Sequence, residues 1–202
     1  MKKVVIATSN QGKLKEYREM LSPLAFDCLS LDDINYKEDI VETGKNFLEN
    51  SKIKAEKVYN FCHLPVIGDD SGLMVKALLG NPGIYSRRYA GENATDQENT
   101  DKLLKELKKI ENSSDFDACF ICFITYIDSM GEISVFGELK GKIILEKRGE
   151  NGFGYDPVFY LDEYKKTVAE LDEGVKNLIS HRSKALNNLV LKLKRRKDIW
   201  KL

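Results

Sequence analysis

Two carboxylates stand side by side at Asp69 and Asp70, between an apolar run that ends at Gly68 and the turn-forming pair Ser71-Gly72. Adjacent carboxylates at the end of a buried strand are costly unless a cation holds them. The pair therefore indicates a divalent metal, or one carboxylate kept as a base by its neighbour. Strand ends are also where open α/β sheets bind ligands. A plain polar turn explains the same residues, and the sequence leaves both interpretations open.

A second polar cluster, Thr8 to Lys13, follows the first apolar run and opens a segment in which Leu14, Tyr17 and Leu21 recur at helical spacing. The unpaired N–H groups of a helix N-terminus attract an anion, and hydroxyl, amide and ammonium groups lie in the same stretch. The stretch is not the GxxxxGK[ST] phosphate loop, which is absent from the sequence. A helix cap followed by a solvated lysine is the plainer alternative.

Three further groups of residues could contribute to a site. Glu42 lies just before a helix predicted over 45–62, and Asn50 and Lys54 share one face of that helix because they are four residues apart. A glycine-rich loop over 149–157 carries aromatic residues that could stack on a planar base, and its glycines allow close backbone approach to a ligand. A plain loop with core aromatics is the alternative there.

The last group precedes the final predicted helix. It consists of Lys176 and the segment Ser180-His181-Arg182. His181 is one of only two histidines in the chain, and a helix start is a poor place for a core histidine.

Strands and helices alternate along the chain, so the predicted fold is α/β with a mixed central sheet flanked by helices, in a single domain over 1–202. An apolar run over 118–127 predicts a central strand, and a turn leads from it into a second strand over 133–139, so part of the sheet should be antiparallel. Shorter strands are predicted over 3–8, 64–68 and 157–160, and a capping box at Thr95 and Glu98 should start a helix with Leu103, Leu107 and Ile110 on one face. The helix over 45–62 should bury a stripe made of Leu48, Ser51, Ala55, Val58 and Cys62. A final helix after Ser180 should bury Ala185, Leu186, Leu189, Val190 and Leu193.

Composition narrows the class of protein. The 202 residues are 42% hydrophobic and 32% charged, as in globular chains, and 32 Lys and Arg balance 32 Asp and Glu. Zero net charge argues against a general nucleic-acid binder, but a few lysines could still hold a small polyanion. No signal-peptide core and no run of about 18 apolar residues occurs, so we expect a cytoplasmic chain with no membrane partner and with four reduced cysteines. Cys119 and Cys122 should face opposite sides of a strand, which argues against zinc.

In this order and combination, the motifs closely resemble the Ham1/RdgB inosine triphosphate pyrophosphatase family, over residues 4 to about 193. The motifs that carry the resemblance are Thr8-Ser9-Asn10-Gln11-Gly12-Lys13, Glu42-Thr43-Gly44 with Phe47 and Glu49-Asn50, Asp69-Asp70-Ser71-Gly72-Leu73, Pro82-Gly83-Ile84-Tyr85-Ser86, Phe153-Gly154-Tyr155-Asp156-Pro157 and Ser180-His181-Arg182. Arg87 and the basic tail after Leu193 depart from the family pattern, and neither departure touches the chemistry.

The resemblance implies Mg²⁺-dependent hydrolysis of the non-canonical purine nucleoside triphosphates ITP, dITP and XTP to the monophosphate and pyrophosphate, by attack of water on the α-phosphorus. It also implies a homodimer and an elongated two-lobed fold with the active site in the cleft between lobes. Hypoxanthine and xanthine carry a 6-oxo acceptor where adenine carries a donor. A donor-lined pocket would therefore reject adenine by about 10² to 10⁵.

On this resemblance Glu42 and Asp70 would hold Mg²⁺, Asp70 would orient and deprotonate the attacking water, and Asp69 would support Asp70. The triphosphate would be held by Thr8, Ser9, Asn10, Gln11, Gly12, Lys13, Lys54 and Lys176. Phe153 would stack on the base, and its edge would be read by Asp156, His181 and Arg182. Ser71, Gly154 and Tyr155 complete the expected substrate-binding residues.

Two other functions stay open at this point. One is a Maf-like nucleotide pyrophosphatase acting on pyrimidine or modified nucleotides, although such chains open with a Ser-Pro-Arg-Arg turn and this one has Ser9-Asn10-Gln11-Gly12. The other is a non-catalytic nucleotide- or RNA-binding module that uses the basic tail. Asp69 and Asp70 would repel the ligand of such a module unless a metal intervened.

Overall fold

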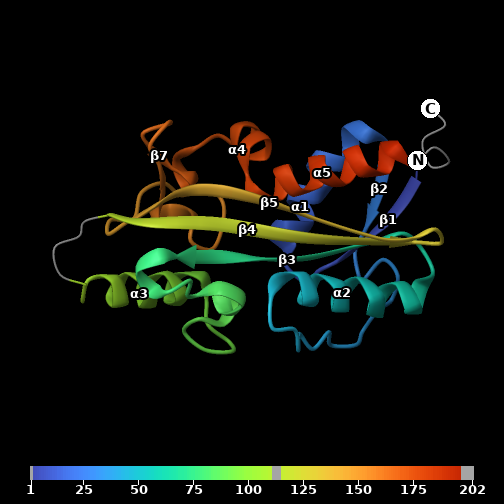
Figure 1. The fold of residues 1–202 in the computed structure, drawn as a ribbon, viewed down its shortest axis with the longest axis horizontal. Coiled ribbons are helices and arrows are strands. Elements are labelled where there is room, and N and C mark those ends of the chain that lie inside the picture. The colour runs from blue at the N-terminus through green and yellow to red at the C-terminus, as the bar shows by residue number, and fades with distance from the viewer. Residues whose placement is uncertain (1, 111–114, 197–202) are drawn as a thin grey trace. The chain divides into compact units, whose positions relative to one another are not determined.

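The computed structural model describes residues 2–110 and 115–196 and contains a seven-stranded sheet flanked by helices (Figure 1). The strand order is β2-β1-β3-β4-β5-β6-β7. β1 is parallel to β2 and β3, whereas β6 is antiparallel to β5 and β7, so the predicted mixed α/β sheet is confirmed. The elements are β1 (Lys2–Ala7), α1 (Gln11–Leu21), β2 (Phe26–Leu29), α2 (Phe47–Cys62), β3 (Val66–Val75), α3 (Asp96–Leu107), β4 (Asp115–Asp128), β5 (Gly131–Ile144), β6 (Phe159–Leu161), β7 (Lys166–Thr167), α4 (Glu173–Ile179) and α5 (His181–Arg195).

The chain separates into two compact units, each with its own hydrophobic core. Unit 1 comprises Met1–Asp70, Cys122–Gly137 and His181–Leu202, and unit 2 comprises Ser71–Ile121 and Glu138–Ser180. β3, β4 and β5 each contribute residues to both units. The single domain and the cleft that the family resemblance implies stay predictions.

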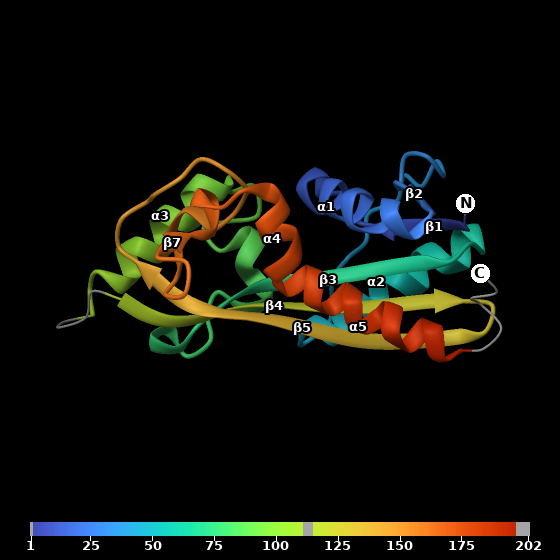
Figure 2. The same cartoon turned by 90° about the horizontal axis from the view of Figure 1, so that it is seen from above.

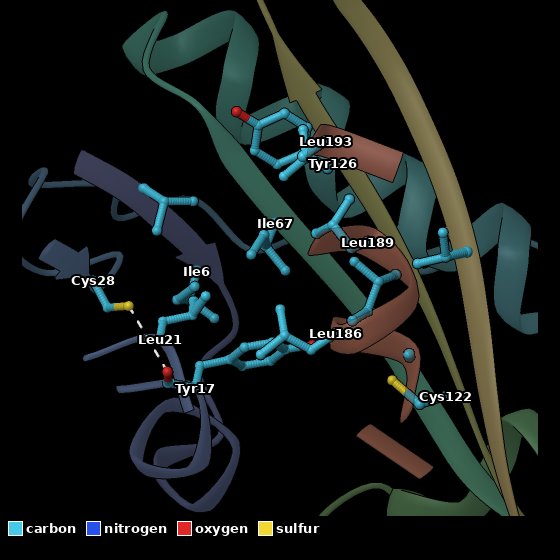
Figure 3. Packing of buried hydrophobic residues seen from close by; sticks show 14 of the residues in the cluster. Ile6, Tyr17, Leu21, Cys28, Ile67, Cys122, Tyr126, Leu186, Leu189 and Leu193 are labelled. Carbon is cyan, nitrogen blue, oxygen red and sulfur yellow. Dashed lines mark hydrogen bonds between the residues drawn. The ribbon is translucent and has the colours of Figure 1, made fainter. Parts of the chain in front are cut away.

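In unit 1, α1 and α5 cover one face of the strands and α2 covers the other (Figures 1 and 2). On the first face, Tyr17 and Leu21 of α1 and Leu186 and Leu189 of α5 pack with Ile67 of β3 in one buried cluster (Figure 3). The helical spacing of these residues is the reason that each helix presents a continuous apolar stripe to the sheet. The burial predicted for the final helix is confirmed at Ala185, Leu186, Leu189, Val190 and Leu193.

The second face of unit 1 depends on a close approach between α2 and β3. A Cβ on Gly68 would collide with the backbone of α2 at Ser51 and Ala55, so only glycine lets the helix lie this near the strand. The predicted α2 stripe is correct at Ala55 and Val58 but wrong at Leu48, which is exposed. The helix begins at Phe47, which takes the core position instead.

Unit 2 is organised around a separate apolar cluster. Leu103 and Leu107 of α3 pack in it with Phe159 of β6. The predicted capping box is confirmed, because Thr95 and Glu98 exchange side-chain and backbone hydrogen bonds at the start of α3. α3 ends at Leu107, so Ile110 packs against the cluster from beyond the helix.

Two sequence predictions of strand length were too short. The strand predicted to stop at Gly68 continues through Asp69 and Asp70 to Val75, and the strand predicted over 133–139 runs to Ile144. All four cysteines are free thiols, as expected. Among the described residues, no helix has both the length and the apolar character needed to cross a membrane.

Candidate functional site

The paired carboxylates lie inside β3 and point to opposite faces of the strand, because side chains alternate along extended backbone. Asp69 contacts residues of α1 and α5, and Asp70 contacts residues of α2. Both residues are at most 5% exposed. The interpretation of these residues as a polar turn at a strand end was therefore wrong. The strand continues through both aspartates because partners on each face compensate their buried charges.

Asp69 is the centre of a buried network on the first face. Its Oδ1 accepts a hydrogen bond from Lys13 Nζ at 2.5 Å, and its Oδ2 accepts from Tyr17 Oη and Arg182 Nε, each at 2.8 Å. The Cys122 thiol lies 3.4 Å from the same Oδ2. Burial, reinforced by the negative charge of Asp69, raises the pKa of Tyr17 well above its ordinary value, so its hydroxyl stays a protonated donor.

Arg182 lies in this network and is 1% exposed. Its guanidinium pairs with Glu16 of α1 as well as with Asp69. The four charged side chains Lys13, Glu16, Asp69 and Arg182 therefore sum to zero formal charge. The predicted contact of Arg182 with a base edge stays a prediction, and the structure gives this residue a second task, which is to hold Asp69 in place.

Asp70 belongs to a second cluster, on the α2 face. Lys54 Nζ lies 3.0 Å from Asp70 Oδ1 and 2.9 Å from Glu42 Oε1, so one ammonium bridges the two carboxylates. Asn50 donates from Nδ2 to Asp70 Oδ2 at 3.1 Å. Asn50 and Lys54 thus act from the same helical face, as their spacing indicated.

The electrostatics of the second cluster suit acid–base chemistry. Burial raises the pKa of Asp70 above its ordinary value, although the positive charges of Lys54 and Lys13 act in the other direction. Burial lowers the pKa of Lys54, but the carboxylates of Asp70 and Glu42 outweigh it and raise that pKa. Asp70 is therefore a carboxylate that accepts a proton more readily than an exposed aspartate does.

The Thr8–Lys13 turn forms the start of α1. Asn10 caps the helix by accepting from the backbone N–H of Lys13 at 3.0 Å, and the N–H of Asn10 donates to Thr8 Oγ1 at 3.1 Å. Ser9 and Gln11 are exposed, and Thr8, Asn10, Gly12 and Lys13 are half-buried. One turn therefore contains both the helix cap and the ion pair between the Lys13 ammonium and Asp69.

A third cluster lies in unit 2. Lys176 Nζ of α4 lies 2.8 Å from Asp156 Oδ2 and 4.7 Å from the centroid of the Phe153 ring. The backbone N–H of Phe153 donates to the same Asp156 oxygen at 3.0 Å. A Cβ on Gly152, which has a φ of +80°, would collide with that oxygen, so glycine is required for the loop to close around Asp156.

Four predicted site residues remain: Tyr155, Gly154 and Ser71 of unit 2 and His181 of unit 1. Tyr155 is buried and donates from its hydroxyl to the carbonyl of Ser86 at 2.7 Å. The N–H of Gly154 donates to Asp96 at 2.7 Å. Ser71 is half-buried on β3. His181 is the first residue of α5, in unit 1, and is also half-buried.

Sequence reasoning missed three contributors to the first cluster. Tyr17 was counted only as an apolar core residue, Glu16 was not considered for a site, and Cys122 was considered only as a zinc ligand and rejected. A signal was present in the spacing, because Glu16 and Tyr17 lie three and four residues after Lys13 and so share its side of α1.

Comparison with known proteins places this arrangement in context. The model of the Ham1 family matches residues 4–192. The chain is 49% identical over 190 residues to the dITP/XTP pyrophosphatase of Bacillus licheniformis, covering 94% of this chain and 96% of that protein. It is 48% identical over 191 residues to the dITP/XTP pyrophosphatase of Bacillus subtilis, with 94% and 96% coverage. It is also similar to the solved structure of a HAM1 protein from Coxiella burnetii, with a TM-score of 0.85 and 41% identity over 96% of this chain and 100% of that one.

Proposed function

The chain belongs to the Ham1 family, and on that premise we propose that it hydrolyses non-canonical purine nucleoside triphosphates, ITP, dITP and XTP, to the monophosphate and pyrophosphate. The observation that carries the proposal is near-full-length identity to proteins named dITP/XTP pyrophosphatase. The buried carboxylate and ammonium clusters of unit 1 supply suitable chemistry for phosphoanhydride cleavage.

In the proposed reaction, Asp70 is the general base. Asn50 donates to one of its oxygens and Lys54 to the other, so both are held in place. The proton of the attacking water passes to Asp70 while the oxygen attacks the α-phosphorus, and the bond to the bridging oxygen breaks to release pyrophosphate. Lys13 and the N–H groups at the start of α1 would neutralise the charge on the phosphate groups.

The residues of the second cluster also fit a magnesium ion. Oxygen ligands are what Mg²⁺ prefers, and this ion is commonly held by one or two carboxylates with substrate phosphates and water completing its shell. The two carboxylates proposed to hold the ion are Glu42 and Asp70, which lie on either side of the Lys54 ammonium. When bound there, the ion would neutralise phosphate charge and lower the pKa of bound water.

The unit 2 cluster is the proposed site of base recognition. The Phe153 ring would stack on the purine, and Asp156 would accept from the base while Lys176 donates to its 6-oxo group. The sequence had grouped Lys176 with the triphosphate, but its contacts with Asp156 and Phe153 favour a role at the base. An ammonium donor facing position 6 favours an oxo group over the amino group of adenine.

Isotope labelling tests the position of attack. Hydrolysis of ITP in H₂¹⁸O should place one ¹⁸O in the inosine monophosphate and none in pyrophosphate, as read by mass spectrometry. Label in the pyrophosphate would mean attack on the β-phosphorus and would refute the mechanism. Asp70→Asn should abolish most of kcat with an unchanged circular-dichroism spectrum, and near-normal turnover would remove Asp70 from the role of base.

We also propose a homodimer in the cytoplasm. The homodimer rests on the family resemblance, and the compartment rests on the intracellular nucleotide pool that the proposed reaction would act on. Sedimentation equilibrium should give twice the chain mass of 23.0 kDa. A mass of one chain at micromolar concentration would contradict the dimer and leave the catalytic proposal unaffected.

A further inference from the structure

The Tyr17 hydroxyl has no place in the mechanism above, yet it donates to the same oxygen of Asp69 as Arg182 does. We propose that Tyr17 is a positioning residue for Lys13: its hydrogen bond to Asp69 weakens the hold of that carboxylate on the Lys13 ammonium and leaves the ammonium available to a phosphate group. The inference rests on one part of the proposed function, namely that Lys13 binds phosphate.

The two oxygens of Asp69 accept hydrogen bonds from different donors. Oδ1 accepts from Lys13 Nζ at 2.5 Å, and Oδ2 accepts hydrogen bonds from Tyr17 Oη and Arg182 Nε. The Asp69 side chain is fully buried, so water does not share this charge. In such surroundings, each donor on a carboxylate reduces the negative charge that acts on the other donors.

Tyr17 can weaken the attraction between Asp69 and Lys13 without changing the charge of the network, because its hydroxyl is a neutral donor. The positive charge of Arg182 is already shared with Glu16, and the four charged groups of the network balance without Tyr17. Loss of the hydroxyl would change no formal charge and would leave the aromatic ring in the core. It would only concentrate the charge of Asp69 on the remaining donors, of which Lys13 is one.

The helix explains why Tyr17 and Lys13 can act on one carboxylate. They lie four residues apart on α1 and therefore project from the same side. Lys13 is at the polar end, where its side chain is 13% exposed, whereas Tyr17 is completely buried. A phosphate group that approaches the start of α1 would thus compete with Asp69 for Lys13.

Calorimetric titration with inorganic pyrophosphate in Mg²⁺ buffer measures this competition without turnover. Tyr17→Phe should raise the Kd for pyrophosphate about fivefold, a part of the worth of a hydrogen bond to a charged group. Tyr126→Phe is a matched control, because Tyr126 lies in the same core cluster and its hydroxyl bonds to Asp128 instead. The control should change Kd by less than about twofold.

A double-mutant cycle separates positioning from a structural role. In a Lys13→Gln background, Tyr17→Phe should leave Kd unchanged, because the group on which it acts is gone. The same fivefold effect in both backgrounds, or no effect in either, would overturn the inference. If the native chain releases no pyrophosphate from ITP but the cycle is non-additive, the proposed function fails and the role of Tyr17 stands. If the native chain releases pyrophosphate from ITP but the cycle is additive, the proposed function stands and the role of Tyr17 fails.

Discussion

Replacement of Lys54 by methionine removes the cation that bridges Glu42 and Asp70 but keeps a side chain of similar length. At separations of 2.9 and 3.0 Å, each pair has a gross Coulomb energy of about 6 kcal/mol at an effective dielectric constant of about 20. Desolvation of Lys54 offsets much of this. Loss of one partner of a buried ion pair costs about 3–5 kcal/mol. Because Glu42 is 25% exposed and partly screened, we expect a loss of about 3 kcal/mol at neutral pH.

Urea unfolding at neutral pH measures this loss directly. Lys52→Met is the matched control, since Lys52 lies on the same helix but forms exposed pairs with Glu56 and Glu132. Its loss should be much smaller than that of Lys54→Met, because exposed ion pairs are screened by water and contribute little to stability. Mg²⁺ should raise the unfolding free energy of Lys54→Met by more than that of the native chain, because the two carboxylates have lost their competing cation. Equal losses for Lys54→Met and Lys52→Met, or no extra stabilisation by Mg²⁺, would refute the bridging role.

Three further predictions follow from the packing and the site. Gly68→Ala should lower the unfolding free energy by about 2–4 kcal/mol, because its Cβ would collide with the α2 backbone, whereas Gly174→Ala, where a Cβ meets nothing, should be neutral or slightly stabilising in the same urea titration. Burial raises the pKa of Cys28 to about 11, so thiol titration of the native chain at pH 8 should spare Cys28, and its reaction should accelerate as the pH rises toward that value and thiolate forms; rapid labelling of Cys28 at pH 8 would contradict its burial. Phe153→Ala should raise the KM for ITP about tenfold with a smaller change in kcat, since one stacking contact with a base contributes about 1–3 kcal/mol; an unchanged KM in steady-state kinetics would exclude stacking.

Local patterns predicted the parts of the fold whose cause is local. The strand, polar turn and helix around Thr8–Lys13 follow from β-branched residues, a capping Asn10 and helical spacing, and all three are present. The joint action of Asn50 and Lys54 followed from their separation of four residues. In each case the interacting groups lie within one or two turns of each other.

The burial of the two aspartates was not predictable in the same way. Gly72 and the paired carboxylates favoured a turn, but β3 continues because Lys54 from α2 and Arg182 from α5 compensate the charges from opposite faces. Arg182 is 113 residues away from Asp69 in the chain. No spacing rule connects residues that meet only through tertiary packing, so the neutral four-charge network became visible only in the folded chain.

The central claim is selective cleavage of non-canonical purine triphosphates, and a pyrophosphate-release assay tests it most directly. We predict high kcat/KM for ITP, dITP and XTP with Mg²⁺, values at least about 100-fold lower for ATP, similarly slow reaction of GTP and UTP, and loss of activity when Mg²⁺ is chelated. Release of orthophosphate from ITP, preference for UTP, or equal rates with all purine triphosphates would contradict the account.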